Sequence, residues 1–454
     1  MSKSSRNIDM LNGPMFLKII MFALPLALSS ILQLLFNAAD TVVVGQYAGS
    51  QALAAVGSNG ALINLIVNAF MGLSIGANVI VARYRGEGDE SGIHKAVHTA
   101  ILVALICGCA LGVIGYFLAP QLLILMGTPD DVIHLSSLYT KIYFMGMPFL
   151  MLYNFGAAIL RSIGDTKRPL VYLTVAGVIN VILNLFFVIM FKMSVAGVAL
   201  ATVISHVISC VLVLHSLTKE EGSLKLELRK LAIDKTILGE IVRVGLPAGL
   251  SGCVFSLSNV VIQSSINTFG SVVVAGNSAA GNIQGFLYVS MNSFHQSCVT
   301  FSSQNYGAKQ YDRCDKALLI SGTMAVITGL SLSTLFIVFG EQLLSLYTND
   351  PLVIKAGLLR MYWLFSFEAL DGLMDILIAG LRGIGYSLLP TIVTVCGVCV
   401  FRLFWVYTIF SANPTIEVLY MAYPISWTIT CIAHTTCYLI GRKKIRNKLM
   451  YTSL

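Results

Sequence analysis

A ten-residue segment that occurs twice places the strongest constraint on the fold. Leu160–Pro169 reads LRSIGDTKRP and Leu381–Pro390 reads LRGIGYSLLP, with Leu, Arg, Ile, Gly and Pro in the same places. Close to half of the 454-residue chain separates the copies, and Leu24-Pro25 matches Leu246-Pro247 at nearly the same separation. A long internal period decides the architecture before any element is assigned. The sequence therefore predicts two homologous halves.

Apolar runs long enough to cross a membrane recur in both halves. The chain is 56% hydrophobic and only 11% charged, whereas a soluble domain carries about 25% charged residues. A spanning helix needs about 20 apolar residues, and the runs lack the alternation that is typical of membrane β-strands. We expect twelve spanning helices, at roughly 16–46, 52–82, 93–117, 131–158, 169–190, 193–217, 238–267, 272–303, 314–338, 352–380, 389–410 and 415–440.

The predicted fold class is an all-α polytopic membrane protein with two pseudo-symmetric six-helix bundles. The repeats are parallel, because an even number of spans makes both halves enter the membrane from the same side. The expected domains are an N-terminal bundle at 1–217, a charged cytoplasmic linker at 218–237, a C-terminal bundle at 238–441 and a basic tail at 442–454. We expect the linker to form a short surface helix.

The basic residues of the loops predict the orientation. Most of the 29 Lys and Arg residues fall on one side of the predicted spans, from Lys3 and Arg6 through the turns with Arg161 and Arg382 to the tail. Basic loops stay in the cytoplasm, so both termini are predicted to be cytoplasmic, in the plasma membrane of a bacterium. The net charge of +8 reflects this topology rather than a nucleic-acid partner, and the tail can contact anionic lipid.

In the first half, the candidate functional residues are Asp40, Asn180, Asn184 and Thr202. A charged side chain at the bilayer centre costs at least about 2.5–3.5 kcal/mol, so its presence needs a reason. Asn180 and Asn184 are four residues apart and share a helix face. One carboxylate with two amide oxygens and a hydroxyl suits Na⁺, or a proton carried by Asp40. The alternative is that Asp40 lies at the outer interface and caps a helix end.

In the second half, Glu368, Asp371 and Asp375 lie on one stripe of the predicted tenth span. Arg402 on the next span lies at a similar depth, so we expect an ion pair with Asp371. The remaining carboxylates would give the cleft a negative character and hold a cationic substrate or a proton. The alternative is a buried ion-pair network that fixes the helix register. The first half has no charges at the matching positions.

Two prolines mark corresponding places in the first span of each half. Pro25 and Pro247 lie within predicted helices, where a proline removes a backbone hydrogen bond and produces a bend. We interpret them as candidate hinges, with a plain kink as the alternative.

The chain resembles the multidrug and toxic compound extrusion (MATE) transporters. The resemblance rests on the two parallel six-span halves, on Asp40-Thr41 followed by Gly45 and Ala48-Gly49, and on the Arg-x-x-Gly-x-x-x-x-Pro pattern that occurs twice. It implies a V-shaped pair of bundles and export by alternating access coupled to Na⁺ or H⁺.

The resemblance also implies a coupling site. In one branch of the family, an Asp on span one is joined by Asn and Asp on span five and by Thr on span six. Here these places hold Asp40, Asn180, Asn184 and Thr202. Because position 184 is Asn, Asp40 is the principal titrating group. Another branch uses an acid on span seven, where this chain has Phe255.

The predicted function is an antiporter that exports amphipathic, cationic organic compounds in exchange for H⁺ or Na⁺. The expected partners are small organic molecules and the lipid bilayer, with the chain acting as a monomer. No G-x-x-x-x-G-K-[ST] or H-E-x-x-H motif occurs, so we expect no ATP, no cofactor and no enzymatic activity. The alternative within transport is a flippase for a lipid-linked precursor, which predicts a more basic cleft. A membrane scaffold or receptor is disfavoured by the intramembrane acids.

Overall fold

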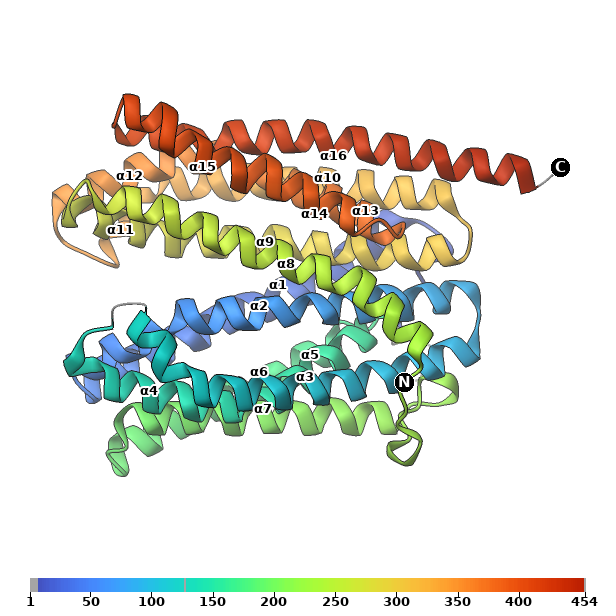
Figure 1. The fold of residues 1–454 in the computed structure, drawn as a ribbon, viewed down its shortest axis with the longest axis horizontal. Coiled ribbons are helices and arrows are strands. Elements are labelled where there is room, and N and C mark those ends of the chain that lie inside the picture. Colours follow the sequence, from blue (N-terminus) through green and yellow to red (C-terminus); the bar gives the residue numbers. More distant parts are fainter. Residues whose placement is uncertain (1–6, 126–127, 453–454) are drawn as a thin grey trace. The chain divides into compact units, whose positions relative to one another are not determined.

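The computed structural model describes residues 7–125 and 128–452, which form helices and turns without a β-strand (Figure 1). The first half contains α1 (Met15–Tyr47), α2 (Ser50–Glu87), α3 (Glu90–Leu125), α4 (Asp130–Met145), α5 (Met147–Ser162), α6 (Lys167–Leu185), η2 (Phe186–Met190) and α7 (Ser194–Thr218). The second half contains α8 (Lys235–Asn267), α9 (Ser271–Gly307), α10 (Tyr311–Val338), α11 (Gly340–Ser345), α12 (Pro351–Phe365), α13 (Glu368–Gly383), α14 (Leu388–Thr394), η5 (Val395–Val400), α15 (Phe401–Trp405), η6 (Val406–Phe410) and α16 (Ile416–Thr452). The basic residues Lys3 and Arg6 lie outside the described residues.

Each of the twelve predicted spans overlaps a helix or a run of successive helices. Within the described residues, nine helices are long and apolar enough to cross a membrane, or ten when α4 and α5, bent by 48° at their junction, count as one span. The helix α9 and the pair α12–α13 fall outside this set. Because α9 is rich in amides and hydroxyls and α13 carries three carboxylates, these helices are more polar than their neighbours. The chain is therefore a multi-pass membrane protein.

The helices form two contact units. Unit 1 contains residues 7–9 and Leu28–Gly249, and unit 2 contains Met10–Ala27 and residues 250–452. The unit boundaries in α1 and α8 thus fall two residues after Pro25 and Pro247. The domains predicted from the sequence follow the repeat instead, so they keep each of these helices whole. In the structure the first part of α1 belongs to unit 2 and the first part of α8 belongs to unit 1. The predicted domain boundaries therefore stay a prediction.

Unit 1 is organised around α5, which packs against α2, α3 and α7. The start of α8 crosses α2 at two glycines of α2. A Cβ atom at Gly72 would lie 2.1 Å from the backbone nitrogen of Gly249, and one at Gly76 would lie 2.4 Å from the carbonyl oxygen of Ile241. Small residues of this kind let two helix backbones approach closely in a membrane protein.

The linker differs from the predicted surface helix. It forms two short 3₁₀ turns, Gly222–Leu224 and Leu228–Lys230, joined by extended residues. Leu224 and Leu226 are both buried, because alternate residues of an extended segment point to the same side. Burial of these two leucines holds the linker against unit 1 and leaves Lys225 exposed between them.

Asp234 fixes the start of α8. Its carboxylate accepts hydrogen bonds from the backbone N–H groups of Thr236 and Ile237, at 3.0 and 3.2 Å, and lies 3.4 Å from Lys95 Nζ on α3. Donation by the Ile237 N–H, followed by that of Thr236 and the charge of Lys95, lowers the pKa of Asp234 below its usual value. The carboxylate is therefore ionised as it caps the helix.

Unit 2 is organised around α9, α10 and α13, which pack against one another, with α12 on α9 and α16 on α13. The start of α1 belongs to this unit. The Phe22 ring packs edge-on against Phe301 of α9, with centroids 5.7 Å apart. The Met10 carbonyl accepts hydrogen bonds from Asn305 Nδ2 at 3.2 Å and from Arg313 Nη2 at 3.1 Å. These contacts attach the N-terminal segment to the turn between α9 and α10.

Candidate coupling and substrate sites

Asp40, near the end of α1, meets side chains of α6 and α7. Asn184 Nδ2 donates a hydrogen bond to Asp40 Oδ1 and lies 3.3 Å from Asn180 Oδ1. Asn180 Nδ2 lies 3.4 Å from Thr202 Oγ1. The four predicted residues thus lie together in unit 1, joined by a continuous chain of hydrogen bonds. Asp40 caps no helix end, because α1 continues to Tyr47; the role of the four residues as a coupling site stays a prediction.

Asn184 presents its amide nitrogen to the Asp40 carboxylate. If the oxygen and nitrogen of the Asn180 amide are exchanged, its nitrogen donates to Asp40 Oδ1 at 2.8 Å. In either orientation Asn184 Nδ2 faces the same carboxylate oxygen. Asn184 is fully buried, and its Oδ1 has no donor among the described residues. Within the described part of the chain, no group of three or more His, Cys, Asp or Glu side chains could hold a metal ion.

A glycine brings α1 close to α6 at this site. A Cβ atom at Gly177 would lie 1.9 Å from Cε2 of the Phe36 ring. Because Phe36 and Asp40 are four residues apart on one helix face, this close contact brings the carboxylate beside α6. The helix then widens into a π-helical turn, η2, directly after Asn184 and Leu185. Such turns occur frequently at functional sites.

Two tyrosines near Asp40 were not part of the prediction, and a histidine packs against one of them. Tyr139 and Tyr143 of α4 stack with centroids 6.1 Å apart, and both lie within electrostatic reach of Asp40. The His206 ring lies edge-on to Tyr143 at 6.0 Å, and its Nε2 has no described partner. The spacing of four in Tyr139–Tyr143 and in Thr202–His206 is the sequence signal that could have identified them.

In unit 2, Glu368 lies at the start of α13 and is 1% exposed. Gln284 Nε2 donates to both of its carboxylate oxygens, at 3.1 and 2.9 Å. Arg360 Nη2 donates to Gln284 Oε1 at 2.8 Å, and its Nη1 donates to the carbonyl of Asn277 at 3.1 Å. The Gln284 amide thus connects a buried acid to a guanidinium group without a direct ion pair between them.

Asp375 lies two turns before Arg382 on α13. It accepts a hydrogen bond from the Tyr288 hydroxyl and interacts electrostatically with Arg382. We predicted Arg382 in a turn, but α13 continues to Gly383, and Arg382 in its last turn is 6% exposed, inside unit 2. The assignment of this end of α13 to the cytoplasm stays a prediction. A spacing of seven from Asp375 continues the acidic stripe and could have revealed it.

The predicted ion pair between Arg402 and Asp371 is absent from the described structure. Arg402 is 1% exposed; its Nε donates to Ser426 Oγ at 3.1 Å, while Nη1 and Nη2 have no described hydrogen-bond partner. Its guanidinium carbon lies 4.2 Å from the ring centre of Tyr423 and 5.8 Å from that of Trp427. Asp371 acts on Arg402 only through longer-range electrostatics.

Unit 2 brings three guanidinium groups near its three carboxylates. Arg360 and Arg402 interact electrostatically with Glu368, Arg402 with Asp371, and Arg382 with Asp375. Glu368, Asp371, Arg382 and Arg402 are buried, whereas Asp375 and Arg360 are half-buried. Phe255 lies 5.6 Å from the Arg402 guanidinium and offers a cation–π contact. The expected acidic character of the cleft stays a prediction.

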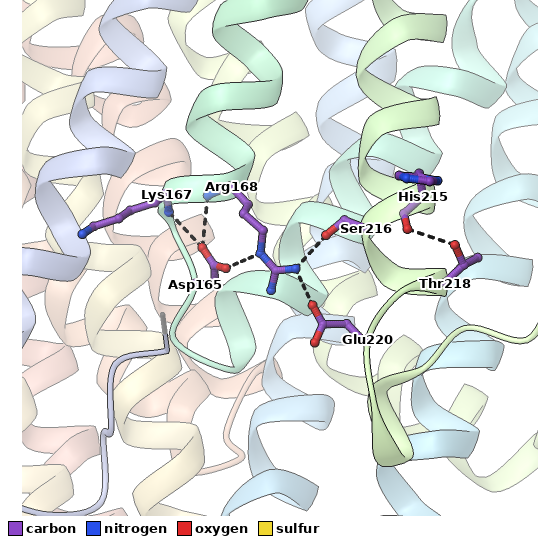
Figure 2. Close-up of polar contacts among 7 residues, drawn as sticks. All are labelled: Asp165, Lys167, Arg168, His215, Ser216, Thr218 and Glu220. Carbon is purple, nitrogen blue, oxygen red and sulfur yellow. Dashed lines mark hydrogen bonds and ion pairs between the residues drawn. The ribbon is translucent and has the colours of Figure 1, made fainter. Parts of the chain in front are cut away.

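The first copy of the repeated segment lies between α5 and α6, and its side chains contact the end of α7 (Figure 2). Asp165 Oδ1 accepts hydrogen bonds from the backbone N–H groups of Lys167 and Arg168, at 3.1 and 3.0 Å, and Oδ2 accepts one from Arg168 Nε. Arg168 Nη1 donates to Ser216 Oγ at 2.7 Å and to Glu220. This arginine therefore connects three segments at one end of unit 1.

Pro25 and Pro247 lie inside continuous helices, α1 and α8. In both helices the contact unit changes two residues after the proline. A hinge at each proline requires such a change of packing partners, and the hinge itself stays a prediction.

Two six-helix repeats with intramembrane charges define a polytopic membrane transporter. The MatE family model matches residues 25–186 and 247–408, two stretches that begin at the corresponding prolines, Pro25 and Pro247. The chain belongs to the MatE family, which confirms the resemblance to MATE transporters and the internal repeat. Because this is a family of transporters, the chain falls in no enzyme class.

Named relatives and solved structures agree with this assignment. The chain is 31% identical to the "Probable multidrug resistance protein YoeA" of Bacillus subtilis (strain 168), over 83% of this chain and 82% of that protein. It is 26% identical to a "FAD transporter" of Shewanella oneidensis, over 76% and 77%. The outward-facing structure of a multidrug resistance MATE family transporter superposes with a TM-score of 0.89 at 23% identity, covering 98% of this chain and 99% of that one. That structure shares the fold.

Proposed function

We propose that the chain is an antiporter that exports amphipathic organic compounds in exchange for a cation taken up at Asp40, without ATP or a cofactor. The proposal rests on the hydrogen-bonded chain from Asp40 through Asn184 and Asn180 to Thr202, where three helices meet. An intramembrane carboxylate with such partners is a candidate functional site. The name of the Bacillus subtilis relative, a probable multidrug resistance protein, supports export of organic compounds.

The coupling ion that we propose is H⁺. Na⁺ would need the side-chain oxygens of Asp40, Asn180, Asn184 and Thr202 to converge on one point. Instead, Asn184 directs its nitrogen at the Asp40 carboxylate, and Asn180 does so in one of its two orientations. Amide donors suit a carboxylate that alternates between a charged and a protonated form. Protonation would weaken these hydrogen bonds and release α1 from α6.

Coupling requires that the proton and the substrate favour different conformations, since a ligand that binds both equally shifts no equilibrium. Asp40 lies on the part of α1 that follows Pro25, within unit 1. We propose that protonation of Asp40 favours one bend of α1 at Pro25 and that substrate release accompanies it. Pro247 would serve the same purpose in α8.

Organic cations are the substrate class that we propose, with Glu368, Asp371 and Asp375 as the attracting groups. Asp371 is the best candidate, because it is buried and forms no ion pair with Arg402. A cation near this carboxylate would gain electrostatic attraction in a low-dielectric environment.

A second candidate class is anionic amphipaths, including a lipid-linked precursor moved by a flippase. The observation that favours it is the set of buried donors without described partners: Arg402 Nη1, Arg402 Nη2 and Trp427 Nε1. A carboxylate or phosphate oxygen would satisfy them. The Shewanella oneidensis relative, named a FAD transporter, is consistent with an anionic substrate.

The orientation and oligomeric state that we propose are those of a bacterial inner-membrane monomer with both termini in the cytoplasm. The support is the concentration of Lys and Arg on one side of the predicted spans. Reporter fusions at each terminus, active only in the cytoplasm or only outside it, test the orientation.

The test of the proposal is transport by Asp40→Asn, which keeps the size of the side chain and removes the titrating group. We expect efflux of a fluorescent organic cation from loaded proteoliposomes to fall at least about tenfold, because no proton can be exchanged at position 40. Thr41→Val is the matched control, since among the described residues the Thr41 hydroxyl bonds only to the Asn37 carbonyl of its own helix, at 3.0 Å. Transport by Asp40→Asn at the rate of the control variant, at equal reconstitution, would contradict the proposal.

A further inference from the structure

A basic pocket lies at the turn between α9 and α10, and its lining contains none of the residues of the candidate transport sites. Its volume is about 490 Å³, and its lining combines one end of α10 with the last turns of α16. The lining residues are Lys309, Gln310, Tyr311, Asp312, Arg313, Arg442 and Arg446. Four of these seven side chains are cationic and one is anionic.

Lys309 occupies a backbone conformation that favours glycine. Its φ is +58°, and it ends α9 with the hydrogen bonds Lys309 N to Tyr306 O, at 3.0 Å, and Gln310 N to Asn305 O, at 2.8 Å. This pattern normally places glycine at the left-handed position, because a Cβ atom is strained there. A lysine that is held in a strained conformation inside a pocket suggests a function for its side chain.

The first half of the chain shows what the same turn looks like without this lysine. Gly88, which occupies the place of Lys309 in the first repeat, has φ +71° and ends α2 with the corresponding hydrogen bonds. The residues that follow it are Asp89 and Glu90. The repeated turn is therefore acidic with a relaxed glycine in the first half, and basic with a strained lysine in the second.

Two of the four cationic groups in the pocket are already occupied. Arg442 binds Asp315 through Nε, at 2.9 and 2.8 Å, and Asp312 through Nη2, at 2.8 Å. Arg313 donates to backbone carbonyls of the N-terminal segment, including that of Met10 at 3.1 Å.

The other two cationic groups are available. Lys309 and Arg446 are exposed, and their side chains form no hydrogen bond or ion pair with another residue in the described part of the chain. Asp312, the acid of the lining, is engaged by Arg442 and does not neutralise them. The pocket therefore holds two uncompensated positive charges, those of Lys309 and Arg446, beside two arginines that already have partners.

We propose that this pocket binds a phosphate group, held by Lys309 and Arg446. The phosphate belongs either to the headgroup of an anionic phospholipid at the membrane surface or to a small soluble phosphate. Guanidinium groups form bidentate hydrogen bonds with phosphate, and an ammonium group supplies a compact charge. Basic pockets between helices at a membrane surface have the charge that anionic lipid headgroups require.

The test compares two double variants of the full-length protein. Lys309→Gly with Arg446→Gln empties the pocket of its free charges, and glycine at 309 keeps the turn because Gly88 occupies the matching place. Lys443→Gln with Lys444→Gln removes the same charge from exposed positions of α16 outside the pocket. A thermal melt of each detergent-solubilised variant checks that it is folded.

Two ligands distinguish the sources of the phosphate. Native mass spectrometry measures retention of phosphatidylglycerol against phosphatidylcholine, and calorimetry measures binding of inorganic phosphate. We expect the pocket variant to lose affinity about fivefold for each basic residue removed, about 25-fold in all, while the control pair changes it by less than about twofold.

A loss confined to phosphatidylglycerol identifies a lipid site, and a loss confined to inorganic phosphate identifies a soluble ligand. Equal losses in both double variants would mean diffuse attraction by the tail and would overturn the proposal. Binding of both ligands that is insensitive to Lys309 and Arg446, or no binding of either by the wild-type protein, would overturn it as well.

Discussion

In the first half of the chain, one carboxylate, Asp40, lies beside amide groups, whereas the second half brings three carboxylates near three arginines. Corresponding helix positions supply both arrangements. Thr202 ends the hydrogen-bonded chain from Asp40, and Tyr423, at the matching position of the second half, lies 4.2 Å from the Arg402 guanidinium. Asn184, which binds Asp40, corresponds to Trp405. At these two positions the repeat keeps the helix and changes the chemistry of the side chain.

The difference implies a division of labour. A single carboxylate with neutral partners can gain or lose one proton without disturbing other charges. A set of six ionisable groups that interact with one another depends on every member, because removal of one changes the electrostatic environment of the others. We therefore expect variants in the second half to affect folding strongly and variants at Asp40 to affect transport.

The largest effect on folding is expected for Arg402→Met. Loss of the guanidinium removes its hydrogen bond to Ser426 and its contact with the Tyr423 ring, and leaves Asp371 and Glu368 with less positive charge nearby. It should cost about 3 kcal/mol, seen as a lower melting temperature in detergent. The double variant Arg402→Met with Asp371→Asn should recover much of this loss, because the two charges interact. Additive losses in the double variant would show that Arg402 acts through its aromatic contacts alone.

A smaller loss is expected for Gln284→Leu. The substitution removes both donors to the Glu368 carboxylate and the acceptor of Arg360, and an unsatisfied buried group costs about 1–3 kcal/mol. Gln296→Leu on the same helix is the control, since within the described part of the chain the Gln296 amide donates only to Asn292 of its own helix. If both variants melt at the same temperature, the connection from Glu368 to Arg360 contributes nothing to stability.

The smallest effect is expected for Arg168→Leu, which gives the first repeated turn the residue that the second has at Leu389. Arg168 joins Asp165, Ser216 and Glu220, but Asp165 keeps two backbone donors, so the loss should be about 1 kcal/mol. Lys167→Leu removes the same charge from an exposed neighbouring side chain. A melting temperature for Arg168→Leu equal to that of Lys167→Leu would mean that this turn is as tolerant as its counterpart.

The repeat and the helices could be predicted from the sequence, because both depend on local periodicity and on the length of apolar runs. The cluster of Asp40, Asn180, Asn184 and Thr202 came from their polarity within apolar spans and from the resemblance to a family. Depth in the membrane follows from a rise of about 1.5 Å per residue. Polarity, length of apolar runs and depth can all be derived from the order of residues along the chain.

The predicted ion pair between Arg402 and Asp371 was wrong for a reason that residue spacing along the chain does not reveal. The π-helical turn η5 (Val395–Val400) lies directly before Arg402, and a π-turn changes the helical register by inserting a residue. The depth of Arg402 could therefore be estimated while the face on which it lies could not. The aromatic surroundings, Tyr423 among them, come from another helix and depend on tertiary packing.

Arg382 and the linker were missed for different reasons. Arg382 lies near a predicted helix end, where the rule on basic loops favours a turn, and its burial beside Asp375 places it in α13 instead. The linker reads as charged and helical, but Leu224 and Leu226 are buried, and burial overrides local propensity.

Transport driven by imposed gradients tests the central claim most directly. Proteoliposomes that hold the wild-type protein and a fluorescent organic cation receive a pH gradient or a Na⁺ gradient, each without the other. Because Asp40 is proposed to exchange protons, the account predicts transport driven by the pH gradient, none driven by Na⁺, and loss of the pH response in Asp40→Asn. Transport driven by the Na⁺ gradient alone, or a pH response that persists in Asp40→Asn, would contradict it.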